Sequence, residues 1–200
     1  MNDRYKTVLV VGDSSSVGPG AAPEETIAGR LAATFGVNVV HLSVNGAKTG
    51  DIIHQVESVS KERFALTIIH AGNNDITHFT RLNQLKNEIT TLFDKAKHIS
   101  DEVVVFRGGN MGNFPIFPVS VGWIFATRSK QVRDLFMEIA REKSVLYVEK
   151  FMSRKDDIFL KRPHHFYCWD LVHLNGNGYK VWFDYLIQEL RKNNMNLDSQ

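Results

Sequence analysis

Short runs of apolar, mostly β-branched residues recur along the chain, separated by more polar segments. The runs lie at residues 7–11, 37–44, 64–71, 102–108 and 144–149. Each run is almost continuously apolar instead of alternating, which is typical of strands buried on both faces of a parallel sheet. The pattern therefore predicts a parallel sheet at the centre of the fold.

Segments with the periodicity of amphipathic helices separate most of these runs. They cover residues 23–35, 81–97 and 129–142, together with a C-terminal segment that carries Tyr179, Trp182, Phe183, Leu186, Ile187 and Leu190. Alternating strands and helices predict a three-layer α/β/α fold with right-handed crossovers. No linker, repeat or low-complexity tract interrupts the pattern, so we expect a single domain over residues 1–200. Only residues 106–127 lack either period, and we expect a long functional or mobile loop there.

Composition narrows the class of protein. The chain has 43% hydrophobic residues, 23% charged residues and a net charge of +2, which favours a soluble globular protein and gives no sign of a nucleic-acid surface. Cys168 is the single cysteine, so an internal disulfide is excluded. No run approaches the roughly 20 apolar residues of a membrane span, and residues 7–11 are too short for a signal-peptide core. We expect a cytoplasmic protein, although a signal removed beforehand would leave no trace.

Polar and glycine residues follow the apolar runs at the places where ligands bind in open α/β sheets. Ser14 follows the first run, Gly46 the second and Asn74 the third, while Asp170 and His173 lie far along the chain. A serine hydroxyl becomes a nucleophile when a base removes its proton, and His173 is a candidate base that Asp170 could orient from three residues away. The backbone N–H groups of Ser14 and Gly46 and the amide of Asn74 are candidate donors to an oxyanion.

These blocks, in this order, resemble the SGNH/GDSL hydrolase family. The blocks are Gly12-Asp13-Ser14, Gly46, Gly72-x-Asn74-Asp75 and Asp170-x-x-His173, and the resemblance extends from residue 7 to about residue 190. It implies a flavodoxin-like five-stranded sheet of order 2-1-3-4-5. It also implies hydrolysis of a small-molecule carboxylic ester or thioester through an acyl-enzyme, without a metal or other cofactor.

The resemblance further implies roles for individual residues. Ser14 would be the nucleophile, His173 the base and Asp170 its orienting acid, with Gly46 and Asn74 completing an oxyanion hole around the Ser14 N–H. The chain departs from the family at Ser15 and Ser16, where the family varies, and at Leu174, where proline is frequent; these departures leave the substrate open.

Several residues have other interpretations. Asp75 and His78 repeat the Asp-x-x-His spacing, so spacing alone does not choose the base. We interpret Cys168 as a small apolar filler, with a thiol nucleophile as the alternative.

His164 and His165 lack the spacing of a metal site. His41 and His70 interrupt apolar runs and are expected to be hydrogen-bonded core histidines. Asp13 is expected to brace its loop through backbone N–H groups.

Bulky residues in and after the 106–127 region suggest a wall for an acyl group. The candidates are Phe114, Phe117, Trp123 and Trp169, and core packing or a dimer contact are the alternatives. The oligomeric state is not readable from the sequence.

Two other functions stay open at this point. One is a catalytically silent module with the same fold that binds an acylated or glycosylated ligand. The other is a phosphate or mononucleotide binder built on the loop from Gly12 to Gly18. The charge of Asp13 and the lack of a known phosphate-binding glycine pattern count against the second.

Overall fold

A central parallel sheet organises the molecule. The structure, a computed structural model, describes residues 7–195 and 197. The strands are β1 (Thr7–Gly12), β2 (Asn38–His41), β3 (Phe64–His70), β4 (Ser100–Arg107) and β5 (Leu146–Glu149). They pair in the order β2-β1-β3-β4-β5, and every pair is parallel. The flavodoxin-like order expected from the resemblance is therefore confirmed.

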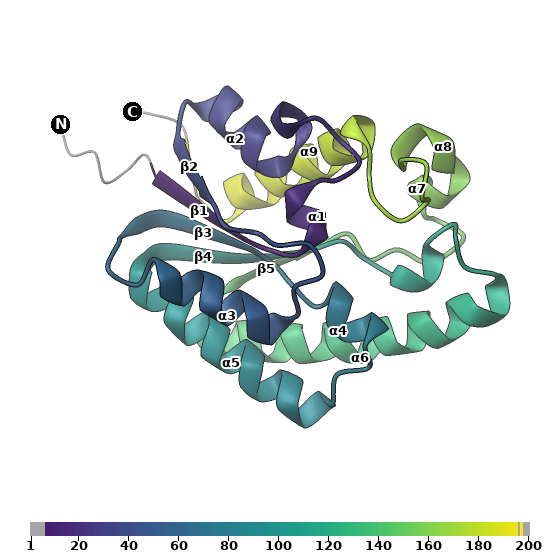
Figure 1. The fold of residues 1–200 in the computed structure, drawn as a ribbon, viewed down its shortest axis with the longest axis horizontal. Coiled ribbons are helices and arrows are strands. Elements are labelled where there is room, and N and C mark those ends of the chain that lie inside the picture. The colour runs from purple at the N-terminus through teal and green to yellow at the C-terminus, as the bar shows by residue number, and fades with distance from the viewer. Residues whose placement is uncertain (1–6, 196, 198–200) are drawn as a thin grey trace.

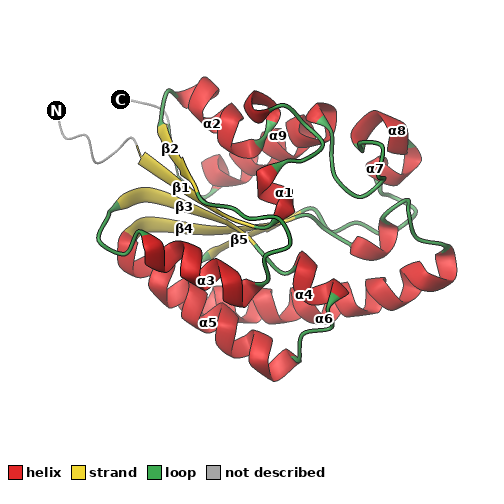
Figure 2. Ribbon diagram, in the orientation of Figure 1, coloured by secondary structure: helices red, strands yellow, loops and turns green. Residues whose placement is uncertain are grey.

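Helices cover both faces of the sheet (Figures 1 and 2). One face carries α2 (Ile27–Phe35) and α9 (Gly176–Lys192), and the other carries α3 (Thr49–Ser58), α5 (Leu82–Ile99) and α6 (Val119–Lys143). Each face buries its own apolar cluster, because successive side chains of a strand point to opposite sides. Val8 and Val10 of β1 belong to one cluster, whereas Leu9 and Val11 belong to the other.

Short helices cluster at the carboxyl ends of the strands. They are α1 (Ser14–Val17), η2 (Pro23–Glu25), α4 (Asn73–Thr77), η3 (Met111–Asn113), α7 (Ile158–Lys161) and α8 (Pro163–Phe166). This end of the sheet is the one where parallel α/β folds bind ligands. Within the described residues, no helix combines the length and the apolar character needed to cross a bilayer.

Two sequence expectations about local structure were wrong, and one element was missed. The region 106–127 is not a continuous loop, because α6 starts at Val119 and its first turns extend past the sheet (Figure 1). There the side chains of Val119 and Trp123 are 71% and 72% exposed, so no single apolar stripe marks the helix. Helix α3 was not anticipated. His41 lies exposed on the edge strand β2 instead of in the core.

His70 is buried, as the sequence predicts, but the predicted hydrogen bond of its side chain is not found in the described structure. Its side chain is 2% exposed, and Nε2 has no hydrogen-bond partner in the described structure. The ring stacks on Trp182 and meets the ring of Phe106 edge-on, at centroid distances of 6.3 and 5.1 Å. Burial lowers the pKa of His70 to about 3, so the imidazole is neutral at pH 7.

Candidate active site

The turn after β1 presents the hydroxyl of Ser14. Gly12 has φ +156°, and a Cβ at this position would lie 2.5 Å from the carbonyl oxygen of His70, so the turn requires glycine. Asp13 caps α1 by accepting a hydrogen bond from the N–H of Ser15 at 2.8 Å, as expected for a bracing residue. Ser14 is therefore the first residue of a helix at the carboxyl edge of the sheet. Because the Asp13 carboxylate occupies this helix start, the turn is poorly suited to an anion such as phosphate.

A closed loop before α9 fixes the orientation of Asp170 and His173. The backbone N–H of Cys168 donates to the carbonyl of His173 at 2.8 Å, and Asn175 N–H donates to the carbonyl of Phe166 at 2.9 Å. At the tip of this loop, Asp170 Oδ1 accepts the backbone N–H of His173 at 2.9 Å. The carboxylate thus holds its own loop in shape and leaves Oδ2 directed at the imidazole.

The fold brings Ser14, His173 and Asp170 together. His173 Nε2 lies 3.0 Å from Ser14 Oγ, and His173 Nδ1 lies 2.6 Å from Asp170 Oδ2. The side chains of His173 and Asp170 are only 27% and 24% exposed. Burial alone would raise the pKa of Asp170, but the hydrogen bonds from the imidazole and from nearby backbone N–H groups outweigh it and hold this pKa well below its usual range. Asp170 is therefore ionised beside the imidazole.

Gly46 and Asn74 face the same cleft as Ser14. Gly46 has φ +79°, and a Cβ built there would meet no atom within 4 Å, so its surroundings are open. The Nδ2 group of Asn74 donates to the carbonyl of Ala47 at 3.0 Å and contacts Asp13 Oδ2 at the longer distance of 3.4 Å. One N–H of Asn74 is thus firmly held, while the other is weakly engaged at the edge of the cleft.

Buried carboxylates support the turns on which these groups lie. Asp13 is 1% exposed, and burial raises its pKa to about 6. Asp75 is 0% exposed and accepts two hydrogen bonds from Thr49, at 3.0 Å from the backbone N–H and at 2.7 Å from the hydroxyl. Asp75 therefore connects the start of α3 to α4 and does not contact His78.

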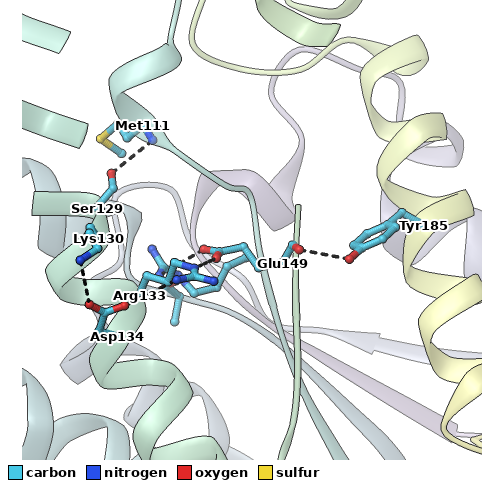
Figure 3. Close-up of polar contacts among 9 residues, drawn as sticks. Met111, Ser129, Lys130, Arg133, Asp134, Glu149 and Tyr185 are labelled. Carbon is cyan, nitrogen blue, oxygen red and sulfur yellow. Dashed lines mark hydrogen bonds and ion pairs between the residues drawn. The ribbon is translucent and has the colours of Figure 1, made fainter. Parts of the chain in front are cut away.

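Sequence reasoning missed a buried ion-pair cluster beneath this end of the sheet. Arg107 and Glu149 have side chains that are 0% and 2% exposed, and they end the adjacent strands β4 and β5. Glu149 accepts a hydrogen bond from Arg133 Nε of α6 at 2.8 Å, and its backbone carbonyl accepts the Tyr185 hydroxyl at 3.1 Å (Figure 3). Arg107 Nε also donates to the carbonyl of Ala71 at 3.2 Å.

This cluster connects the ends of β4 and β5 to the segment that follows β3. Ala71 directly precedes Gly72 and helix α4, so Arg107 links the end of β4 to the segment that holds Asn74. The signal available in the sequence was a pair of opposite charges, Arg107 and Glu149, at the ends of two apolar runs.

A cleft of about 500 Å³ opens beside Ser14. Of the bulky residues suggested as its wall, Phe114 and Trp169 line it, although Trp169 is 93% exposed. Phe117 and Trp123 do not line the cleft. Phe117 stacks on Phe125 with the ring centroids 4.6 Å apart, and Trp123 points outward from α6.

The other candidates have different surroundings. His78 is exposed, and its Nδ1 lies 2.8 Å from the carbonyl of Asn74. The thiol of Cys168 is not packed as an apolar filler, because it donates to Asp170 Oδ1 at 3.1 Å. Burial raises the pKa of this thiol, which disfavours the thiolate. His164 and His165 are exposed, and no group of three or more His, Cys, Asp or Glu side chains in the described part of the chain is arranged to hold a metal ion.

The fold and the site define a class of protein. A serine hydroxyl, an imidazole and a carboxylate in hydrogen-bond contact, with N–H donors beside them, are the groups that serine hydrolases use. The chain belongs to the GDSL-like lipase/acylhydrolase family, whose model matches residues 10–181. This is a family of ester-bond hydrolases, so the family resemblance expected from the motifs is confirmed. No curated protein sequence matches the chain significantly.

Solved structures share the fold at low sequence identity. The psychrotrophic esterase EstA from a Pseudoalteromonas species is 16% identical, and the match covers 96% of this chain and 100% of EstA with a TM-score of 0.72. TesA is 20% identical over 94% of this chain and 99% of its own, with a TM-score of 0.70. An acetyl-xylooligosaccharide esterase from a Geobacillus species, Axe2, is 16% identical over 98% and 97% of the two chains, with a TM-score of 0.68. These likenesses concern the fold alone.

Proposed function

We propose that the protein is a serine esterase that cleaves a carboxylic ester or thioester through an acyl-enzyme. The observation that carries the proposal is the contact of His173 Nε2 with Ser14 Oγ at 3.0 Å, on an imidazole whose Nδ1 lies 2.6 Å from Asp170. Membership of a family of ester-bond hydrolases supports the same chemistry.

In the first half-reaction, Ser14 Oγ bonds to the ester carbonyl carbon while its proton moves to His173 Nε2. The carbonyl oxygen becomes an oxyanion, which the N–H groups of Ser14 and Gly46 and the amide of Asn74 stabilise. Asp170 stabilises the imidazolium, which then gives its proton to the departing alcohol or thiol. In the second half-reaction, water attacks the acyl-enzyme by the same route, releasing the acid and restoring Ser14.

A fluorophosphonate probe tests the nucleophile directly, because it reacts with an activated serine. Wild type should be labelled at Ser14, and the Ser14→Ala variant should not. Ser15→Ala is the matched control, since it removes the next hydroxyl of the same helix, which accepts a hydrogen bond from Asn73 instead of contacting His173. Labelling that persists in Ser14→Ala would place the nucleophile elsewhere.

Turnover distinguishes an esterase from a silent binding module of the same fold. We expect wild type to release p-nitrophenol from p-nitrophenyl esters, and Ser14→Ala to lose this release. If wild type reacted with neither the probe nor a panel of esters graded by acyl length, the binding-module function would replace the one proposed here.

A further inference from the structure

A basic residue, Lys150, belongs to the lining of the cleft at the β5 end of the sheet. It directly follows β5, and it lines the cleft together with Gly108 and with Trp182 of α9. Within the described part of the chain, it is the one lysine or arginine that lines the cleft. The mechanism proposed above does not use it.

The surroundings of Lys150 provide it with no ion pair. Its Nζ lies 5.5 Å from the centre of the ring of Tyr185, which is in α9 one turn after Trp182. None of the described carboxylates lies within ion-pair distance of this Nζ. The side chain is partly buried, and burial lowers the pKa of Lys150 because loss of water disfavours the charged form. The ammonium group therefore has no ion-pair partner among the described residues and lies in a partly desolvated place.

The nearby carboxylate of Asp157 is committed to other contacts. Its Oδ2 accepts the Asn113 amide at 2.8 Å, and its Oδ1 accepts the backbone N–H groups of Phe159 and Leu160 at 2.9 and 3.4 Å. Asp157 is 7% exposed and caps α7. The charge of Asp157 favours the protonated form of Lys150. Its oxygen atoms, however, accept hydrogen bonds from Asn113 and from the start of α7 and form no ion pair with the lysine.

Apolar side chains form much of the remaining wall of the cleft. They include Met111, Phe114, Met152, Phe159 and Trp182. A small-molecule site typically combines such walls with a few polar groups that fix the orientation of the ligand. An aliphatic or aromatic spacer fits these walls, and a negative group at its end would meet Lys150 where low polarity strengthens the attraction.

We propose that Lys150 binds an anionic group of the substrate, so that the cleft selects esters bearing a carboxylate or phosphate away from the scissile carbonyl. The inference rests on the function proposed above and specifies its substrate class. Lys150 acts here as a specificity-determining residue, because it would contact the bound substrate without taking part in bond making or breaking.

Matched esters test the charge preference. The half-ester of adipic acid with p-nitrophenol and p-nitrophenyl hexanoate have acyl chains of similar length and differ in the terminal carboxylate. We expect wild type to have the higher kcat/KM for the half-ester, and Lys150→Met to lower the ratio of the two values by about tenfold or more. Lys150→Arg should keep the preference. Lys155→Met, an exposed lysine outside the cleft, is the matched control and should change neither value.

A second pair of esters places the charge on the alcohol part. Hexanoate esters of 4-hydroxybenzoate and of neutral 4-hydroxybenzamide identify which side of the ester bond reaches Lys150. A preference that depends on Lys150 in either pair supports the proposal. It also shows whether the acyl part or the alcohol part of the substrate carries the anionic group. If Lys150→Met leaves the ratio unchanged in both pairs, the proposal is wrong.

Binding to an inactive variant separates this proposal from the proposed function. In a Ser14→Ala background, we expect calorimetry to show tighter binding of monoethyl adipate than of ethyl hexanoate, and the additional change Lys150→Met to remove the difference. Equal binding within this pair, and also within the pair of hexanoate esters of 4-hydroxybenzoate and 4-hydroxybenzamide, would overturn the role of Lys150 even if neutral esters are hydrolysed in a Ser14-dependent way. Hydrolysis that survives Ser14→Ala would instead contradict the proposed nucleophile, and the kcat/KM ratios of the matched esters would then test the role of Lys150.

Discussion

The imidazole Nε2 of His173 lies 3.0 Å from the hydroxyl oxygen of Ser14, although 159 positions separate the two residues in the sequence. Ser14 reaches this place from the end of β1, and His173 from the loop before α9. The contact depends on two local features of the structure. One is the turn at Gly12, and the other is the set of backbone hydrogen bonds that Asp170 accepts within its own loop. Variants of the groups around this contact lead to separate predictions.

Asp170→Asn should lower kcat by about 10³–10⁴ with little change in KM. An amide cannot stabilise the imidazolium as a carboxylate does, and it favours the wrong tautomer of His173. Steady-state kinetics on a p-nitrophenyl ester measures the effect. Asp156→Asn changes an exposed carboxylate that accepts a hydrogen bond from Ser153, and it should leave kcat unchanged. A loss below about tenfold in Asp170→Asn would mean that His173 is not oriented through this carboxylate.

Cys168→Ala should retain most of the activity, with kcat/KM reduced by less than about tenfold, the equivalent of one ordinary hydrogen bond. The thiol donates to Asp170 Oδ1 at 3.1 Å, so its removal loosens the carboxylate but takes away no reacting atom. Cys168→Ser restores a donor and should recover part of the loss. Complete inactivation of a folded Cys168→Ala variant would instead favour the thiol as the nucleophile.

Asn74→Ala should lower kcat by about 10²–10³, because one donor to the oxyanion is lost. KM should change less, since the charge that this donor meets develops only in the transition state. Asn73→Ala is the comparison, since that neighbouring amide donates to Ser15 Oγ at 2.9 Å. Circular dichroism and thermal unfolding should show that both variants fold. Similar rates for both would argue against Asn74 as an oxyanion donor.

The positions of the candidate site residues followed from the sequence because each lies next to a regular element. Ser14, Gly46 and Asn74 come directly after apolar runs, and parallel strands place such residues at one edge of the sheet. The Asp-x-x-His spacing could not distinguish Asp170 and His173 from Asp75 and His78. Position in the fold makes the distinction, since Asp75 turns toward Thr49.

Other features of the fold could not be predicted from the sequence because they depend on tertiary packing. Helix α3 has few apolar positions, among them Ile52 and Val56, and its start is marked only by Asp51, which accepts the N–H of Lys48 at 2.9 Å. The buried Arg107–Glu149 pair contradicts the usual expectation that charged residues lie at the surface. No local sequence pattern predicts that α6 covers the side chains of Arg107 and Glu149.

Asp13 should make stability fall as the pH rises from about 4 to about 7. Its pKa is raised from 3.8 to about 6 by burial, so the folded state binds more protons than the unfolded state within this window. The change in the pKa of Asp13 from 3.8 to about 6 corresponds to about 3 kcal/mol. Asp13→Asn lacks this contribution, and its free energy of unfolding relative to wild type should rise by about that amount between pH 4 and pH 7. Urea denaturation at both pH values measures the difference, and parallel pH profiles would contradict the prediction.

His70 should act in the opposite direction over an overlapping range. Burial lowers its pKa from 6.5 to about 3, so the unfolded state binds more protons between these values, and stability is lost as the pH falls below 6.5. At pH 4.5 this loss amounts to about 3 kcal/mol relative to pH 7.5, since two pKa units separate pH 4.5 from the unfolded value. His70→Phe keeps a ring against Trp182 and Phe106 but cannot titrate. The stability of wild type relative to this variant should therefore be about 3 kcal/mol lower at pH 4.5 than at pH 7.5. Because both proteins carry Asp13, its contribution cancels in the comparison, and an unchanged difference would mean that the buried imidazole already binds its proton in the folded state at pH 4.5.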